Sequence, residues 1–368
     1  MERQFKTLFL RLLQSLARAP KAAFADLAAN PPKRILVIRQ HDQLGDFLLS
    51  TPVFRALRAF YPSAEISVVA RPYSAALAMH NRYIDQVIVF HDQFRQWNLS
   101  YASQFWRQLR QDFDLAVVLN TVSHSLSSDL IARFSGARFI LGSDQPRFVG
   151  LEHNFFYNLI APYRDLPLPQ NEKNLDIVRA IGADTADHSE HMTLLQEERQ
   201  HAAERLQKSG WNAERPLVAL HPGAGKILNR WPAQYFAQVA NRLAAMSNCQ
   251  FFVTWGPAED ELATNLMQNL QTEAISFQCR DIRELAAILS HASLFICNDT
   301  GVMHLAAAVD TPLIAIFGPT PPEEWKPVGD RFVSLRAPDH RCESVAVEEV
   351  VSQAMGMLKM YPVAEKAG

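Results

Sequence analysis

The sequence predicts an α/β protein with two domains, each built on a parallel sheet. Short apolar runs alternate with longer amphipathic segments, first up to about residue 120 and again from residue 216 onward. Strands that are apolar throughout, instead of alternating with polar residues, are typical of parallel sheets covered on both faces. The length of 368 residues is also that of about two domains.

The first set of elements follows Pro31-Pro32. The expected strands are 34–39, 65–70, 86–90 and 114–120, and the expected helices are 46–60, 73–80 and 101–111. From about Arg147 to Pro169 the chain is aromatic and proline-rich without clean periodicity, and this region through residue 210 is a candidate domain junction. It contains two further helices, 172–182 and 195–208, which end near Gly182 and Gly210.

The second set repeats the same alternation. The expected strands are 216–223, 250–256, 293–297 and 312–318, and the expected helices are 232–246, 259–270, 281–292, 302–309 and 346–360. We therefore divide the chain into a leader (1–33), an N-terminal domain (34–190), a C-terminal domain (191–345) and a closing helical segment (346–368) that could pack back on the N-terminal domain. Ligands of open α/β sheets bind at the carboxyl ends of strands, so functional residues are sought there.

The leader has its own pattern. Its apolar residues fall at helical spacing, and residues 1–34 hold seven Lys/Arg and two acids, a net charge of +5. Such a basic amphipathic helix suits an anionic membrane surface, but its apolar stripe could equally pack on the domain or on a partner subunit. The stripe comprises Phe5, Leu8, Phe9, Leu12, Leu13 and Leu16.

Composition excludes several classes of protein. The formal net charge of −2 gives no field for nucleic acid, and no apolar run reaches the ~18 residues of a spanning helix. Four scattered cysteines without a C-x-x-C pair favour reduced thiols in a cytosolic protein. The sequence lacks H-E-x-x-H and G-x-S-x-G, and the acidic pair 112-DFD-114 precedes its strand, where a ligand site is not expected.

Two strand ends carry candidate polar sites. After the first strand, 39-RQHDQLGDF-47 places Gly45 in a turn and Asp46 in a first helical turn, as a helix cap or as a general base. In 221-HPGAGKILNRWP-232, the amides around Gly223 and Ala224 and the cations Lys226 and Arg230 suit a phosphate. This loop is neither a P-loop nor a G-x-G-x-x-G loop, and a plain turn with a solvated lysine is the alternative.

Two further strand ends complete the candidate set. Glu259 begins a helix, either as a cap or as the acid that receives a ribose diol. In 297-CNDTGVMHLAAAV-309, the amides of Thr300 and Gly301 after Asp299 would bind an anion at a helix N-terminus. The companion loop 317-FGPTPPEEW-325 adds Thr320, and His304 lies one turn inside the helix as a packed residue or a donor-side contact.

Together the motifs RILVIR, LGD, HPGA, RWP, NDTGVMHLAAA and FGPT resemble glycosyltransferase family 9, the ADP-heptose:lipopolysaccharide heptosyltransferases, over roughly residues 34–345. The resemblance implies a GT-B fold, with two Rossmann-like domains facing across a cleft. It implies inverting, metal-independent transfer of heptose from ADP-heptose to the lipopolysaccharide inner core. The ADP-sugar is a substrate, no cofactor is expected, and the site would be the cytoplasmic face of the inner membrane, with peripheral contact.

The resemblance also implies roles for individual residues. Asp46 matches the family's proposed catalytic base, and Gly45 and Arg39 are assigned to the acceptor side. The residues assigned to the donor are Gly223, Ala224, Lys226, Arg230, Glu259, Asp299, Thr300, Gly301, His304 and Thr320. One position departs from the pattern: Asn229 stands where many members carry a lysine that meets the diphosphate.

Two other functions remain open. One is a GT-B enzyme that uses a different nucleotide-sugar or acceptor, for hexosyl or heptosyl transfer. The other is a catalytically silent relative that binds glycan, which only Asn229 supports. The expected partners of an active enzyme are a nucleotide-sugar donor and a lipid-linked oligosaccharide acceptor, with no nucleic acid.

Overall fold

A computed structural model describes residues 19–40, 43–145, 154–279 and 281–361. The predicted amphipathic stripe of the leader lies outside these residues. The chain divides into two compact units, Met1–His188 and Ser189–Gly368, so the division falls two residues before the predicted boundary. Among the described residues, each unit holds one six-stranded sheet, and all the paired strands run parallel.

The N-terminal unit is a Rossmann-like domain with strand order β3-β2-β1-β4-β5-β6. Its strands are β1 (Arg34–Ile38), β2 (Glu65–Ala70), β3 (Gln86–Val89), β4 (Leu115–Val118), β5 (Phe139–Ser143) and β6 (Leu159–Ala161). Its helices are α2 (Phe24–Ala29), α3 (Leu44–Leu48), α4 (Thr51–Phe60), α5 (Pro72–Ala78), η1 (Phe94–Gln96), α6 (Leu99–Leu109), α7 (Leu126–Phe134) and α8 (Gln170–Arg179). The order changes direction between β1 and β4, which is where such sheets bind ligands.

The C-terminal unit repeats this topology, with strand order β12-β11-β10-β7-β8-β9 and a change of direction between β7 and β10. Its strands are β7 (Leu217–His221), β8 (Gln250–Val253), β9 (Ile275–Ser276), β10 (Leu294–Asn298), β11 (Leu313–Phe317) and β12 (Phe332–Arg336). Its helices are α9 (Gln196–Lys208), η2 (Ile227–Asn229), α10 (Ala233–Met246), α11 (Asp260–Asn269), α12 (Ile282–His291), α13 (Gly301–Ala308), α14 (Pro322–Trp325), η3 (Cys342–Ser344) and α15 (Val347–Met360).

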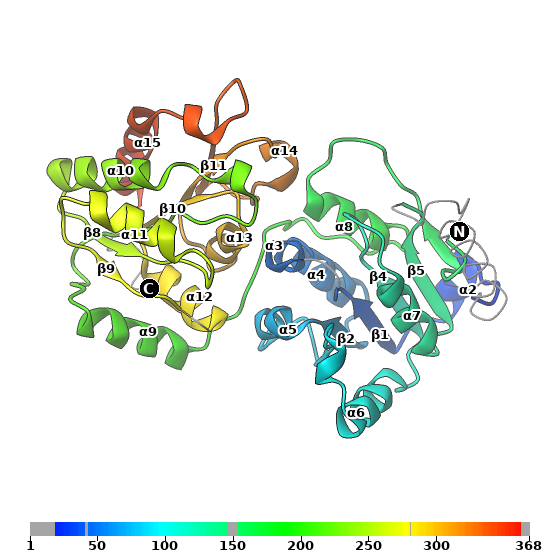
Figure 1. Ribbon diagram of the computed structural model, residues 1–368. Helices are drawn as coiled ribbons and strands as arrows, with labels where there is room; N and C mark the ends of the chain where they lie inside the picture. The colour runs from blue at the N-terminus through cyan, green and yellow to red at the C-terminus, as the bar shows by residue number, and fades with distance from the viewer. Residues whose placement is uncertain (1–18, 41–42, 146–153, 280, 362–368) are drawn as a thin grey trace, which may run out of the picture. The chain divides into compact units, whose positions relative to one another are not determined.

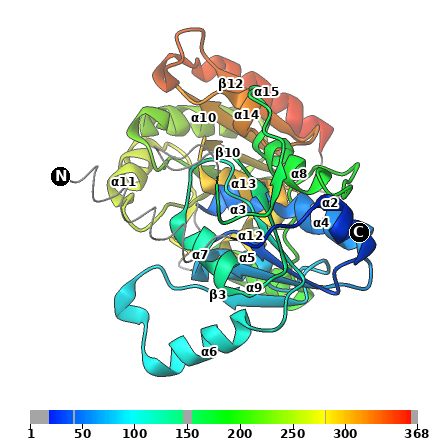
Figure 2. The ribbon, with the colours of Figure 1, turned by 90° about the vertical axis from the view of Figure 1, so that its right-hand side faces the viewer.

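Helices cover both faces of the second sheet, as the apolar strands predict. On one face α10 packs against α11 and α15, and on the other α12 packs against α9 and α13 (Figures 1 and 2). Alternate residues of a strand serve the two faces: Leu294 and Ile296 join the core under α10 and α15, while Phe295 between them points the other way and is also fully buried.

The closing helix α15 corrects one expectation. We expected that it could pack on the N-terminal domain, but its buried residues belong to the core of the C-terminal unit. Val347, Val350, Val351, Ala354 and Met357 form one apolar stripe at helical spacing, and α10 presents the matching surface beside the sheet. The apolar stripe of α15 is therefore buried within the C-terminal unit.

The expected helix 46–60 is two helices, α3 and α4. The break has a local cause. The hydroxyls of Ser50 and Thr51 donate to the carbonyls of Phe47 and Leu48 at 2.6 and 2.7 Å, and Pro52 offers no backbone N–H. The expected turn conformation at Gly45 is also wrong, because Gly45 lies inside α3 and its carbonyl accepts from the amide of Leu49 at 2.9 Å.

Candidate active site

Asp46 lies beyond the carboxyl end of β1, in the first turn of α3. It is 9% exposed. One carboxylate oxygen, Oδ2, accepts the backbone N–H of Gln43 at 2.9 Å, as a helix cap does. The other, Oδ1, is buried and has no hydrogen-bond partner among the described residues. Asp46 can therefore fill both roles predicted from the sequence, because one oxygen caps the helix and the other can accept a proton.

Arg39 lies beneath this carboxylate. Its guanidinium donates to the carbonyl of Asp46 from Nε at 3.2 Å and from Nη2 at 3.0 Å, and Nη1 donates to the carbonyl of Leu119. The same Nη2 is 3.8 Å from Asp46 Oδ1, within ion-pair range. Arg39 is only 4% exposed. From the sequence we assigned Arg39 to the acceptor side. In the structure its side chain is buried, and its hydrogen bonds connect α3 to the end of β4.

In the C-terminal unit, Gly223 and Glu259 form the first part of the candidate donor-binding site. A Cβ atom at position 223 would lie 2.0 Å from Glu259 Oε2, so only glycine leaves room for this carboxylate. Glu259 Oε2 accepts from the amide of Gly256 at 2.7 Å and is 3.5 Å from His221 Nε2. Burial lowers the pKa of His221, which favours the neutral ring. The carboxylate of Glu259 is therefore held at the ends of β7 and β8.

Asn298 is a site residue that the sequence analysis did not single out. Its Nδ2 donates to the carbonyls of Pro222 and Gly223, at 2.8 and 3.3 Å, and its Oδ1 accepts from the amide of Trp231 at 2.9 Å. It is fully buried. An asparagine at the last position of a buried strand is the signal that could have identified it, because a buried amide must find partners. Asn298 thus ties both ends of the glycine loop to β10.

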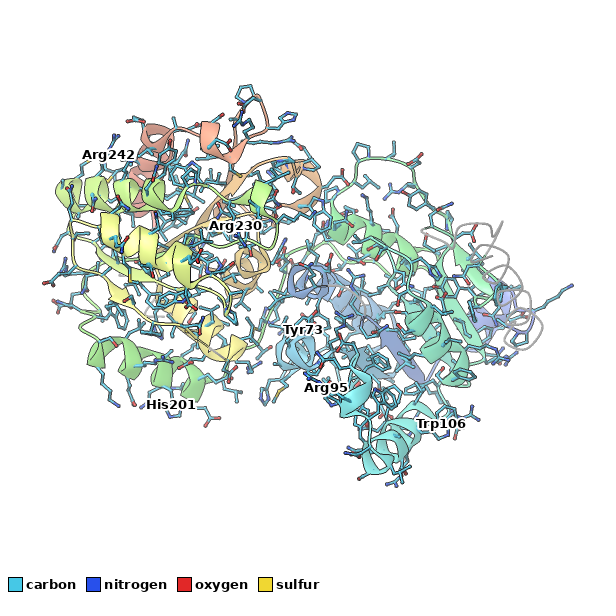
Figure 3. The ribbon with its side chains drawn as sticks, viewed as in Figure 1. Tyr73, Arg95, Trp106, His201, Arg230 and Arg242 are labelled. Atoms are coloured by element: carbon cyan, nitrogen blue, oxygen red, sulfur yellow. The ribbon has the colours of Figure 1, made fainter. Side chains whose placement is uncertain are left out.

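The two cations of the loop differ in their surroundings. Lys226 is exposed and follows Gly225, where a Cβ would meet nothing within 4 Å. Arg230 (Figure 3) is half-buried, and its Nε donates to the carbonyl of Ala224 at 2.8 Å. Lys226 is therefore the cation that the loop presents to solvent, while Arg230 helps to close the loop.

Asn229, Asp299 and Thr320 meet where β10 and β11 end. Asn229 Nδ2 donates to Asp299 Oδ2 at 2.7 Å and to Thr320 Oγ1 at 3.0 Å. Burial raises the pKa of Asp299, and this rise is opposed by the Thr320 hydroxyl and by the charges of His304 and Lys226. The structure thus joins three residues that are far apart in sequence into one polar cluster.

Helix α13 begins next to this cluster. Thr300, its N-cap residue, is in extended conformation and makes no side-chain cap bond. The first amides of a helix have no partner within it, so those of Gly301 and Val302 can bind an anion. One turn further on, His304 is buried and its Nδ1 lies 2.9 Å from Glu190 Oε1. Glu190 precedes the C-terminal sheet and was not selected from the sequence.

The described residues contain no group of three or more His, Cys, Asp or Glu side chains that could hold a metal ion. In that same part of the chain, no helix is both long and apolar enough to cross a membrane. The four cysteines are free thiols. Burial raises the pKa of Cys279 and that of Cys342 to about 12, so neither is poised as a thiolate nucleophile.

Two Rossmann-like units in one chain, with polar residues after the central strands of each, are the architecture of the GT-B fold. Solved structures share this fold. The glycosyl transferase family 9 protein from Veillonella parvula DSM 2008 superposes with a TM-score of 0.79 and 22% identity, covering 89% of this chain and 97% of that one. The E. coli ADP-heptose lps heptosyltransferase II gives a TM-score of 0.73 with 21% identity, covering 89% and 99%.

Residues 102–354 match the model of glycosyltransferase family 9 (heptosyltransferase), and the chain belongs to this family. Among curated relatives, it is 26% identical to lipooligosaccharide heptosyltransferase 2 of Haemophilus influenzae over 309 residues, which cover 80% of this chain and 86% of the relative. The family predicted from the sequence motifs is therefore confirmed.

Proposed function

We propose that the enzyme transfers heptose from ADP-heptose to the inner core of lipopolysaccharide, with inversion and without a metal ion. The observation that carries the proposal is the Asp46 carboxylate, which is anchored through Oδ2 while Oδ1 has no hydrogen-bond partner among the described residues. A carboxylate fixed in this way is suited to receive a proton from an acceptor hydroxyl. Membership of the family and the names of its relatives support the heptose donor and the lipopolysaccharide acceptor.

The reaction would be a single displacement at the anomeric carbon of heptose. The acceptor oxygen forms its bond to this carbon as the bond to the β-phosphate oxygen breaks, and the electron pair stays on the leaving diphosphate. The hydroxyl proton passes to Asp46 Oδ1. Attack opposite the leaving group inverts the anomeric configuration. No metal or cofactor takes part, and the ADP-sugar is consumed as a substrate.

The C-terminal unit would bind the donor. Glu259 would accept the ribose hydroxyls beside Gly223 and Ala224, and Asp299 would accept hydroxyls of the sugar. Lys226 and the first amides of α13, at Gly301, would stabilise the charge that develops on the diphosphate. Thr320, bound to Asn229, and Arg230, bound to the carbonyl of Ala224, hold the donor residues in place.

The acceptor would be a lipid-linked oligosaccharide, and the N-terminal unit, with Asp46, would receive it. The basic, amphipathic sequence of the leader supports peripheral contact with the cytoplasmic face of the inner membrane. We expect that deletion of residues 1–18 releases the protein from anionic vesicles in a flotation assay. Equal flotation of the truncated and full-length proteins would remove the leader from this role.

A donor screen tests the function directly. Purified enzyme is incubated with ADP-heptose, ADP-glucose, UDP-glucose or GDP-mannose and a heptose-deficient lipopolysaccharide acceptor, with and without EDTA. We expect transfer from ADP-heptose alone, an inverted product linkage by NMR, and the same rate with EDTA. A second candidate, transfer from another nucleotide-sugar, is favoured by Asn229 in place of a lysine, and a higher rate with one of the other donors would replace the first proposal.

A further inference from the structure

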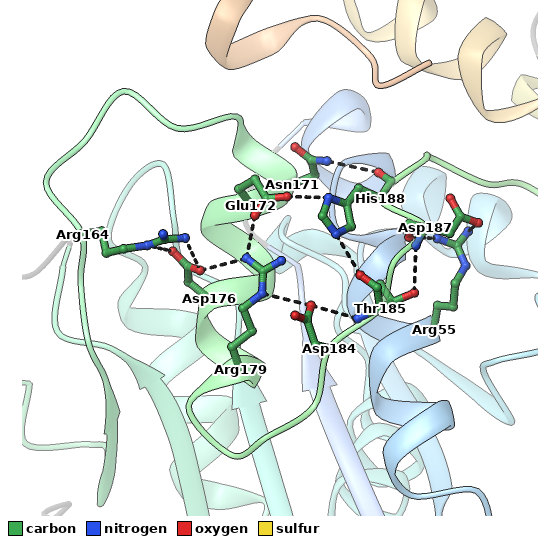
Figure 4. A network of polar contacts seen from close by, with 10 residues as sticks. All are labelled: Arg55, Arg164, Asn171, Glu172, Asp176, Arg179, Asp184, Thr185, Asp187 and His188. Carbon is green, nitrogen blue, oxygen red and sulfur yellow. Dashed lines mark hydrogen bonds and ion pairs between the residues drawn. The ribbon is translucent and has the colours of Figure 1, made fainter. Parts of the chain in front are cut away.

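The segment 184–193, here called the connector, joins the two units and is anchored at both ends by ionic contacts. Its first half is held on the N-terminal unit by a network around α8 (Figure 4). His188 Nδ1 is 2.6 Å from Glu172 Oε1, and its Nε2 lies 2.8 Å from the carbonyl of Thr185. Asp187 pairs with Arg55 at 3.2 Å. These contacts fix the connector up to residue 188.

The second half of the connector is held on the C-terminal unit. The amide of Met192 donates to the carbonyl of Ala308, at the end of α13, at 2.9 Å. Arg283 of α12 donates to the carbonyl of Thr193 at 2.8 Å. Glu190 reaches α13 through His304, with 2.9 Å between Oε1 and Nδ1. The helix whose first turn carries the donor residues is therefore attached to the connector at two points, by the ionic contact of His304 and by the backbone hydrogen bond at Ala308.

The burial of this pair constrains its charge. Glu190 is 6% exposed and His304 is 3% exposed, and Glu190 Oε2 has no hydrogen-bond partner among the described residues. A buried carboxylate with one vacant oxygen is costly unless a cation lies beside it. At 2.9 Å from Nδ1, the carboxylate of Glu190 favours the imidazolium form of His304 and opposes burial, which favours the neutral ring. The aspartate of a catalytic triad stabilises the imidazolium of its histidine in the same way.

His304 is also close enough to Asp299 for its charge to lower the pKa of that carboxyl, against the larger effect of burial. Asn229, which donates to Asp299 Oδ2 at 2.7 Å, is neutral. We propose that Glu190 is a positioning residue for the transfer reaction: it orients His304 through Nδ1 and keeps it protonated, so that the imidazolium supplies charge to the leaving diphosphate that a neutral Asn229 does not. The inference rests on the proposed function, which places the diphosphate at the first amides of α13, one turn before His304.

Other ionisable groups lie on the elements that pack around this pair. Asp299 lies after β10, and Lys226 acts on it from the loop after β7. From α12, Arg283 is paired with Glu198 at 2.5 Å. His191, on the connector, contacts Thr193 Oγ1 at 3.3 Å. Glu190 Oε1 lies 2.9 Å from His304 Nδ1, so the substitution Glu190→Gln removes a negative charge directly beside the ring.

The test is the pH profile of transfer by Glu190→Gln. A group needed as a cation is present at low pH and lost as the pH rises, and removal of the neighbouring carboxylate moves this loss to lower pH. We expect kcat of the variant to equal wild type within about twofold at pH 6 and to fall about tenfold or more below it at pH 8.5, with a smaller change in KM, as for a lost transition-state interaction. A deficit that is constant with pH would reduce Glu190 to a structural role.

Glu172→Gln is the matched control. It removes the carboxylate of the other His–Glu pair of the connector, that of His188, which belongs to the N-terminal unit. Its kcat should follow wild type across the pH range. If it reproduces the profile of Glu190→Gln, the effect belongs to the connector and the proposal fails.

A measurement independent of turnover separates this inference from the proposed function. Full-length protein with labelled histidines is titrated by NMR, and the resonances of His304 are assigned with His304→Asn. We expect His304 to be an imidazolium at pH 7.5 in wild type and neutral in Glu190→Gln. A neutral His304 in wild type overturns the inference even when transfer from ADP-heptose is intact. A different result would overturn only the proposed function: no transfer from ADP-heptose, a charged His304, and tighter ADP binding by calorimetry when His304 is charged.

Discussion

Asn229 donates a hydrogen bond through Nδ2 to Asp299 Oδ2 at 2.7 Å, across 70 residues of sequence. The same amide donates to Thr320 at 3.0 Å, so one neutral side chain orients both polar residues at the ends of β10 and β11. A lysine at this position would supply charge as well as hydrogen bonds. Position 229 therefore supplies hydrogen bonds to this cluster and no charge.

Asn229→Lys should tighten ADP binding. The new ammonium would lie between Asp299 and the diphosphate, and a charge-assisted hydrogen bond of about 1.5 kcal/mol corresponds to roughly tenfold in Kd. Isothermal titration calorimetry measures the change. Asn229→Ala is the control, since it removes both hydrogen bonds and adds no charge, and it should not tighten binding. Equal affinities of wild type and Asn229→Lys would show that the diphosphate lies away from position 229.

Lys226→Ala should weaken ADP binding by about three- to tenfold without lowering the melting temperature, because an exposed lysine contributes charge to a ligand but little to the fold. The difference should shrink at 0.5 M NaCl, where charges are screened. Arg230→Ala should instead lower the melting temperature, because its Nε holds the carbonyl of Ala224. The reverse pattern would assign the diphosphate cation to Arg230.

Gly223→Ala should abolish the binding of ADP while the protein stays folded. The added Cβ would occupy the place of the Glu259 carboxylate, 2.0 Å from Oε2, and the side chain of Glu259 would have to leave. Gly225→Ala, two residues on, is the matched control because its Cβ meets nothing within 4 Å. Thermal-shift titration with ADP compares the two variants. Retained affinity in Gly223→Ala would mean that Glu259 does not bind the nucleoside.

Asp46→Asn should lower kcat by about 10²–10⁴-fold, the usual contribution of a general base, and leave ADP affinity unchanged. Asp26→Asn controls for loss of a helix cap, since Asp26 accepts the amide of Ala23 at 2.8 Å in α2 just as Asp46 accepts that of Gln43. Both variants should lose a similar, small amount of stability, and only Asp46→Asn should lose turnover. Normal turnover of Asp46→Asn would remove the proposed base.

Asp299→Asn should raise the melting temperature at pH 8 and leave it unchanged at pH 3. Burial raises the pKa of Asp299 above its ordinary value of 3.8. The folded state therefore binds its proton more tightly than the unfolded state, and stability falls as the pH rises from 3.8 through the higher folded value. An asparagine avoids this loss. Differential scanning calorimetry from pH 3 to 8 measures it, and a gain independent of pH would point to packing instead of charge.

Much of the fold could be predicted from the sequence, because the central strands of both sheets are continuous apolar runs. The strands that were missed lie at or next to sheet edges. β9 has two residues and β6 has three, and most residues of β12 are only half-buried. An edge strand needs no apolar residue on its open side, so its sequence gives a weak signal. The helix α7 and strand β5 were also missed, in a stretch to which no element had been assigned.

By itself, the sequence determined the two α/β units, the family and the strand ends at which to look for polar residues, because these features follow from local periodicity and short motifs. Only the tertiary structure decided what each polar group touches. Arg39 lies under Asp46, Asn229 orients Asp299, and Glu190 holds His304 across 114 residues. Such partners depend on how strands and helices pack around a shared core, and a buried carboxylate or amide takes whichever complementary group that packing brings within reach.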